Sequence, residues 1–324
     1  MTRFMGDLRA LRGYVPALPT PFCRGRIDEG AFAAFCDWQI REGAAGLVVC
    51  GTTGEAPTLL EWEQRRLVRL AVSVAAGRVP VIAGIGTNAT ERAAYLAQAL
   101  EASFADGLLV VTPYYNRPPQ EGLLAHFTKV HHAVRVPIIL YDVPARTGCQ
   151  LAVETVARLA ELQRIIGIKD ASGDISRARR LRAWIGDGFR IYSGDDATAL
   201  DLLAAGADGC VSVLSNVAPA ACARLQTLWD TDRPEEARAA LRLLQPLIRA
   251  LARESNPIPV KHALSLMGKM SAEVRLPLCR AAAETRALVA AALADCHGTT
   301  PRLPANGPAI FQSDDMAVLF GAYV

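Results

Sequence analysis

Short apolar runs alternate with longer amphipathic segments along most of the chain. The short runs are too brief for helices and read as eight strands, at residues 14–18, 46–50, 80–84, 107–111, 137–141, 165–169, 190–192 and 209–213. The segments between them carry apolar residues at helical spacing, at residues 29–42, 60–75, 90–102, 120–133, 153–162, 175–185 and 197–204. Asp174, directly before the segment at 175–185, is a typical helix N-cap.

The strands are apolar throughout, with no alternation of apolar and polar positions. This pattern indicates burial on both faces and therefore a parallel sheet. Eight strands interleaved with helices predict an α/β fold, a (β/α)8 TIM barrel. A doubly wound open sheet is the structural alternative, but no GxGxxG sequence follows the first strand.

After about residue 218 the sequence reads as helix without further strands. We therefore predict a barrel carrying the active site at residues 1–232 and a helical subdomain at 233–297. A Pro- and Gly-rich stretch opens the last segment, 298–324, which ends in the apolar sequence MAVLFGAYV. We expect this extension, whose role the sequence does not indicate, to be ordered and to bury its end on the helical subdomain or on a neighbouring subunit.

Composition excludes several classes of protein. The chain of 324 residues is 51% hydrophobic and 21% charged, with a net charge of +3, which is too small to indicate binding to nucleic acid or an anionic membrane. It contains no apolar run long enough to span a bilayer and no signal-peptide core, so we expect a cytoplasmic protein. The eight cysteines are scattered without a CxxC pair, so we expect no metal site and no disulfide framework.

Lysine is rare, which makes Lys169 conspicuous. Of the 35 Lys and Arg residues only four are lysine, namely Lys129, Lys169, Lys261 and Lys269. Lys169 ends an apolar strand, and a desolvated lysine can lose its proton and become a nucleophilic amine, whereas arginine cannot. It is therefore a candidate Schiff-base former. The alternative is a lysine that reaches the surface and pairs with Asp170.

Other polar groups also follow strands of the predicted barrel, where active sites of this fold lie. The sequence GTTGE at 51–55 offers hydroxyls and close backbone N–H groups suited to a carboxylate, although many such stretches are only turns. Tyr114, Tyr115 and Tyr141 can relay protons or merely pack. Arg146 can bind a carboxylate or form a structural ion pair.

Three histidines follow the fourth strand in a predicted helix. His126, His131 and His132 fall on its polar face, so we expect them to be solvated and not to act as ligands.

Six motifs together resemble the dihydrodipicolinate synthase family, within the pyruvate-dependent class I aldolases that include N-acetylneuraminate lyase. They are GTTGE at 51–55, VTPYYNRPPQEGL at 111–123, YDVPARTG at 141–148, GIKDASG at 167–173, SGDD at 193–196 and NPIPVKHA at 256–263. The resemblance covers about residues 12–297, in the same order and with nearly the same spacing.

The resemblance implies a lyase of lysine and diaminopimelate biosynthesis that condenses pyruvate with L-aspartate 4-semialdehyde. Lys169 would form an imine with pyruvate, and Tyr141 would be the general acid and base beside it. Thr52 and Thr53 would hold the pyruvate carboxylate, with Thr52 linking Tyr141 to Tyr115 in a proton relay. Tyr115 would enter the site of a neighbouring subunit, within a homotetramer built from tight dimers.

Three further positions match the family's binding residues. Arg146 would bind the carboxylate of the semialdehyde at the entrance, and the backbone of Gly194 and Val211 would line the pyruvate pocket. The imine itself accepts electrons, so the resemblance implies no metal and no organic cofactor.

Two departures from the family pattern bear on the substrate and on regulation. The usual YNVP is YDVP here, so Asp142 would add a carboxylate beside Tyr141 that could disfavour an anionic substrate or change the proton affinity of the tyrosine.

At the family's lysine-effector pocket the matching positions are Glu61, Gln64, Asn88, Arg92 and Tyr114. An arginine there would repel the ammonium group of lysine. We expect weak or no inhibition by lysine, and micromolar inhibition in a steady-state assay would contradict this.

Two alternatives to the synthase remain at this point. One is another pyruvate aldolase or hydratase-aldolase acting on a different aldehyde, although sugar-acid lyases generally lack an arginine at the position of Arg146. The other is a non-catalytic binding protein, which would have no need of Lys169.

Overall fold

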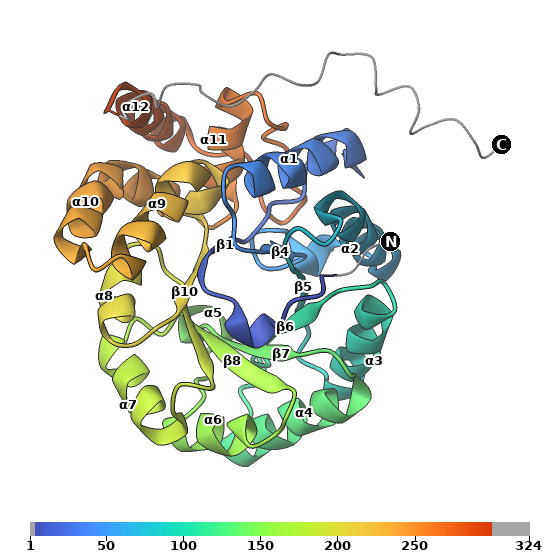
Figure 1. The fold of residues 1–324 in the computed structure, drawn as a ribbon. Coiled ribbons are helices and arrows are strands. Elements are labelled where there is room, and N and C mark those ends of the chain that lie inside the picture. The colour runs from blue at the N-terminus through green and yellow to red at the C-terminus, as the bar shows by residue number, and fades with distance from the viewer. Residues whose placement is uncertain (1–3, 300–324) are drawn as a thin grey trace.

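The computed structural model describes residues 4–299 and shows the expected barrel (Figure 1). Eight parallel strands form one sheet in the order β1-β10-β9-β8-β7-β6-β5-β4. A parallel bridge between Ala17 and Val48 joins the two ends of this sheet, so that the barrel is nearly closed. The predictions that the apolar strands are parallel and that they form a (β/α)8 barrel are confirmed. The predicted docking of the segment 298–324 lies outside the described residues, apart from the end of one helix.

The bounds of the strands lie within two residues of those predicted. They are β1 (Gly13–Pro16), β4 (Leu47–Val49), β5 (Val81–Ile85), β6 (Gly107–Val111), β7 (Ile138–Asp142), β8 (Ile165–Asp170), β9 (Arg190–Ser193) and β10 (Gly209–Ser212). A short hairpin of β2 (Phe22–Cys23) and β3 (Arg26–Ile27) follows β1.

Helices surround the strands. They are α1 (Glu29–Arg41), α2 (Glu61–Ala75), α3 (Thr90–Glu101), α4 (Gln120–Ala133), α5 (Pro144–Thr147), α6 (Val153–Ala160), α7 (Ile175–Ile185), α8 (Ala199–Ala204) and α9 (Pro219–Asp230). The side chain of Asp174 accepts a hydrogen bond from the backbone of Arg177 and caps α7, as predicted. Short 3-10 turns at Leu8–Ala10, Ala56–Thr58 and Leu214–Asn216 complete the barrel.

Three more helices, α10 (Pro234–Leu251), α11 (Ile258–Leu266) and α12 (Ala283–Thr299), gather on one side of the barrel near α1 and α9 (Figure 1). No helix within residues 4–299 is both long and apolar enough to cross a membrane.

The core has two parts, one on each side of the sheet. Side chains that face the barrel interior form one cluster, which includes Val15, Val48, Ile82 and Leu109. The neighbouring positions on the same strands face the helices and form a larger cluster. This double burial explains why the strands read as continuous apolar runs.

The expectation that all three histidines of α4 are solvated is wrong for two of them. His126 and His131 are buried, and only His132 is exposed. Helix α4 packs against α3 and α6, and its apolar residues belong to the larger core cluster, so more of its surface is covered than its polarity suggested. The Nδ1 atom of His126 lies 3.0 Å from the Thr90 hydroxyl, and burial lowers the pKa of His126 to about 4.

Candidate active site

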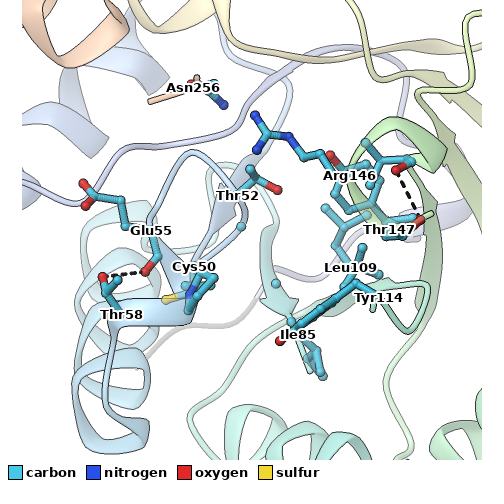
Figure 2. A pocket seen from close by; sticks show the side chains of 18 of the residues that line it. Cys50, Thr52, Glu55, Thr58, Ile85, Leu109, Tyr114, Arg146, Thr147 and Asn256 are labelled. Atoms are coloured by element: carbon cyan, nitrogen blue, oxygen red, sulfur yellow. Dashed lines mark hydrogen bonds between the residues drawn. The ribbon is translucent and has the colours of Figure 1, made fainter. Parts of the chain in front are cut away.

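A cavity of about 280 Å³ opens at the carboxyl ends of the strands. Among the predicted site residues, Thr52, Tyr141 and Arg146 line it, and Figure 2 labels Thr52 and Arg146. Its wall also includes residues from far along the chain, Ser255, Asn256, Pro277 and Leu278. The site was predicted within residues 1–232, and these four residues were missed. Of the four, only Asn256 belongs to a motif noted in the sequence, NPIPVKHA, to which no role was assigned.

Lys169 and Tyr141 lie side by side on adjacent strands. They are register partners of β8 and β7, and Nζ of Lys169 lies 4.2 Å from the centre of the Tyr141 ring. Both side chains are buried, with 6% and 7% of their surface exposed. Within residues 4–299 no carboxylate forms an ion pair with Nζ of Lys169. The alternative in which Lys169 pairs with Asp170 is therefore wrong.

A bulge in β8 sets the direction of the Lys169 side chain. Ile138 pairs with Ile165, but the next residue, Ile139, pairs with Gly167, so Ile166 is an extra residue in β8. In a regular strand, with Ile166 paired in the ladder, Lys169 would lie on the same face as Ile165, which points toward the helices. A bulge that re-aims a side chain is typical of strands next to active sites.

Two carboxylates lie on the opposite face of β7 and β8, the face that is turned toward the helices. Asp142 and Asp170 directly follow Tyr141 and Lys169, and both form ion pairs with the guanidinium of Arg177 on α7, at 2.8 and 3.0 Å. All three side chains are almost fully buried. The expectation that the Asp142 carboxylate lies beside Tyr141, where it could act on an anionic substrate or on the tyrosine, is wrong, because successive residues of a strand point to opposite faces.

The position of Asp142 predicts a pH-dependent stability. Burial raises the pKa of its carboxyl to about 6, although Arg177 opposes this, and Oδ1 has no hydrogen-bond partner among the described residues. A group whose pKa is raised by folding stabilises the protein below its unfolded pKa, and this stabilisation is lost as the pH rises through 6. The neutral side chain of Asp142→Asn does not titrate, so the stability of this variant should not fall over the same pH range.

We expect the unfolding free energy of Asp142→Asn, relative to the wild type, to rise by about 2–3 kcal/mol between pH 4 and pH 7.5. Urea denaturation at several pH values measures this difference. Asp187→Asn, at a fully exposed carboxylate, is the control and should show no such trend. A pH-independent difference for Asp142→Asn would contradict the account.

The GTTGE sequence forms the loop after β4. Thr52 lines the cavity, while the Thr53 hydroxyl accepts a hydrogen bond of 2.9 Å from the Asn256 side chain. The side chain of Thr53 is buried. An oxo acid held by this loop would meet Thr52 first.

Arg146 lies on the short helix α5 at the opposite side of the entrance. Its guanidinium extends across the cavity toward Thr52 and Asn256 (Figure 2). No salt bridge holds this side chain within the part of the chain that the structure describes. The structural ion pair considered from the sequence is thus not formed, and the guanidinium is available to an anion.

The structure does not bring Tyr115 into the cavity of its own chain. Its side chain is 88% exposed, whereas that of Tyr114 lines the cavity. Gly194 and Val211 lie near the barrel interior, Gly194 directly after β9 and Val211 in the inner apolar cluster. A Cβ atom at Gly194 would lie 2.7 Å from Cβ of Ala171, which leaves no room for a larger residue there.

Comparisons with known proteins agree with this arrangement. The model of the dihydrodipicolinate synthetase family matches residues 10–296. The chain is 50% identical over 282 residues to the 4-hydroxy-tetrahydrodipicolinate synthase of Rhodospirillum centenum, covering 87% of this chain and 97% of that relative. The chain belongs to the dihydrodipicolinate synthetase family. The synthase of Hyphomonas neptunium is also 50% identical, over 284 residues that cover 87% and 97% of the two chains.

Solved structures of the dihydrodipicolinate synthetase family share the fold. The synthase of Acinetobacter baumannii, crystallised with pyruvate, superposes with a TM-score of 0.87 at 40% identity and covers 89% of this chain and 99% of its own. Because the family match extends to residue 296, helices α10 and α11 and most of α12 lie within the family's common part. The cavity wall at residues 255–278 therefore belongs to the family's fold.

Proposed function

We propose that the chain is a 4-hydroxy-tetrahydrodipicolinate synthase, which condenses pyruvate with L-aspartate 4-semialdehyde in the biosynthesis of diaminopimelate and lysine. The observation that carries the proposal is the buried amine of Lys169 against the Tyr141 ring, without a carboxylate partner in residues 4–299. The family and its curated members support the choice of reaction.

In this proposal Lys169 attacks the ketone carbon of pyruvate and water leaves, which gives an imine. The imine accepts electrons, so a proton is lost from the pyruvate methyl group and an enamine forms. The enamine carbon then attacks the aldehyde of the second substrate and makes the new carbon–carbon bond. This chemistry requires neither a metal nor an organic cofactor, since the imine is the electron sink.

Tyr141 is the proposed general acid and base. Its ring lies against Nζ of Lys169, so its hydroxyl belongs to the same small space as the imine. Thr52 lines that cavity and would hold the pyruvate carboxylate together with Thr53. The backbone of Gly194 and Val211 would complete the pyruvate pocket.

Tyr115 is the proposed contribution of a neighbouring subunit. Its side chain is 88% exposed, and Leu60, Trp62 and Tyr95 are further large apolar side chains that are at least half exposed. Exposed apolar groups of this size favour burial against another protein surface. We propose that two copies pair tightly so that Tyr115 completes the relay through Thr52, and that two such dimers form a tetramer.

Arg146 is the proposed ligand of the semialdehyde carboxylate. Arg146→Met should raise KM for the semialdehyde about 10- to 100-fold, because a charge-assisted contact is lost. The amount of pyruvate trapped on the enzyme by borohydride should stay unchanged, since Arg146 lies at the entrance and not beside Lys169. Unchanged KM for the semialdehyde in a steady-state assay would exclude this role.

The experiment that tests the proposed reaction is a coupled assay with pyruvate and a panel of aldehydes. The synthase should turn over aspartate semialdehyde with the highest kcat/KM. A preference for sugar aldehydes or aromatic aldehydes would instead indicate another aldolase of the same superfamily. No turnover and no trapped pyruvate would indicate a binding protein.

A further inference from the structure

The chain has a second buried lysine that the proposed reaction does not use. Lys261 lies on α11, within the NPIPVKHA motif, and its side chain is 0% exposed. A buried ammonium group is costly unless it is paired and hydrogen-bonded. Its partners therefore indicate what the residue does.

The partner of Lys261 belongs to the loop that lines the cavity. Nζ lies 2.7 Å from Oε1 of Glu55, whose side chain is also 0% exposed, and 2.8 Å from the backbone oxygen of Thr20. The ring of Phe22 lies 4.3 Å from the same Nζ atom. Glu55 ends the GTTGE sequence, and its second carboxylate oxygen accepts a hydrogen bond from the backbone of Arg275.

The backbone of this loop is in an unfavourable conformation. Glu55 has φ +57° and ψ +37°, in the left-handed region that residues other than glycine rarely adopt. Such a conformation persists only where the surroundings fix it. The Lys261 ion pair holds the side chain of this residue, and the backbone N–H of Glu55 donates to the carbonyl of Thr52 at 3.1 Å.

Two more contacts fix the rest of the loop from outside. The Thr20 hydroxyl donates to the carbonyl of Gly54 at 2.7 Å, and the Asn256 amide donates to the Thr53 hydroxyl at 2.9 Å. Asn256 belongs to the same motif as Lys261, and Figure 2 shows Asn256 and Glu55 on the side of the cavity away from Thr147. Residues about 200 positions later thus hold the loop at both Thr53 and Glu55.

We propose that Lys261, Glu55 and Asn256 are positioning residues that fix the 51–55 loop so that its threonine hydroxyls are set for the carboxylate of the oxo acid. The inference rests on the proposed function, in which Thr52 and Thr53 bind that carboxylate. Arg146 approaches from β7 and α5 and does not depend on this ion pair. Loosening the loop should therefore affect the oxo acid and not the aldehyde.

The test uses Lys261→Met, Glu55→Gln and the double variant in the full-length enzyme. Borohydride trapping at increasing pyruvate concentration gives the concentration for half-maximal labelling, without any aldehyde. We expect this concentration to rise about 10- to 100-fold in each single variant, because misplacement of binding groups has effects of this size. In the double variant this concentration should rise by less than the product of the two single increases, because both variants break the same ion pair. In all three variants KM for the aldehyde should change less than threefold.

Lys269→Met is the matched control, because its Nζ lies over the Trp38 ring, away from the loop, and it should behave as the wild type. If Lys261→Met does not fold in a thermal melt, Asn256→Ala, which removes the hydrogen bond to Thr53, replaces it in the test. Folded variants with unchanged half-maximal labelling would overturn the inference, and so would an equal loss for pyruvate and aldehyde. If the wild type itself traps no pyruvate, the proposed function fails instead.

Discussion

Replacing Lys169 with methionine is expected to lower turnover by at least about 10⁴-fold, because loss of a covalent nucleophile removes the reaction path and not only a contact. Methionine fills a similar volume and suits the buried position, which is 6% exposed. The fold should therefore survive. Initial rates with pyruvate and aspartate semialdehyde, together with a thermal melt, measure both effects.

Two further variants make the Lys169 result specific. Lys169→Arg keeps the positive charge but cannot form an imine, so it should be as inactive as the methionine variant. Lys129→Met removes an exposed lysine that pairs with Glu91 and should leave the rate unchanged. Turnover in Lys169→Met at more than a few per cent of the wild-type rate would show that this amine is not the nucleophile.

Replacing Tyr141 with phenylalanine is expected to lower kcat by about 10²–10⁴-fold, the usual range for loss of a general acid or base. The ring would still pack against Lys169 and the inner apolar cluster, so only the hydroxyl is lost. Pyruvate should still be trapped by borohydride, but more slowly. Stopped-flow or timed quenching of the trapping reaction separates imine formation from the later steps.

Tyr192→Phe is the matched control for Tyr141→Phe. Tyr192 belongs to the same inner cluster and is the register partner of Lys169 on β9, but its hydroxyl donates to the backbone of Leu11 at 2.9 Å. It should affect stability more than kcat. A kcat of Tyr141→Phe within threefold of the wild type would rule out the proposed proton transfer.

Much of the fold could be predicted from the sequence because its signals are local. Runs such as the one at residues 165–168, directly before Lys169, are apolar on both faces, and an N-cap such as Asp174 marks a helix start. The bulge at Ile166 could not be predicted, because it depends on the pairing of β8 with β7. His126 is buried because neighbouring helices cover it, whereas the polarity of its side chain alone predicted that it would be exposed to solvent.

Part of the site could also be predicted from the sequence, because its signals are local. Lys169, Tyr141 and Thr52 follow or end strands, and parallel strands bring their carboxyl ends together. The direction of the Asp142 side chain follows from strand alternation and was misjudged, whereas its ion pair with Arg177 depends on another element. The contacts of Lys261 and Asn256 with the 51–55 loop join segments about 200 residues apart, which no local pattern reveals.

The most direct test of the account is reduction of the enzyme with borohydride in the presence of pyruvate, followed by mass spectrometry of its peptides. The account predicts one added reduced pyruvyl group per chain, on the peptide that contains Lys169. An adduct on Lys261 or another lysine, or an unmodified enzyme under conditions of full turnover, would contradict it.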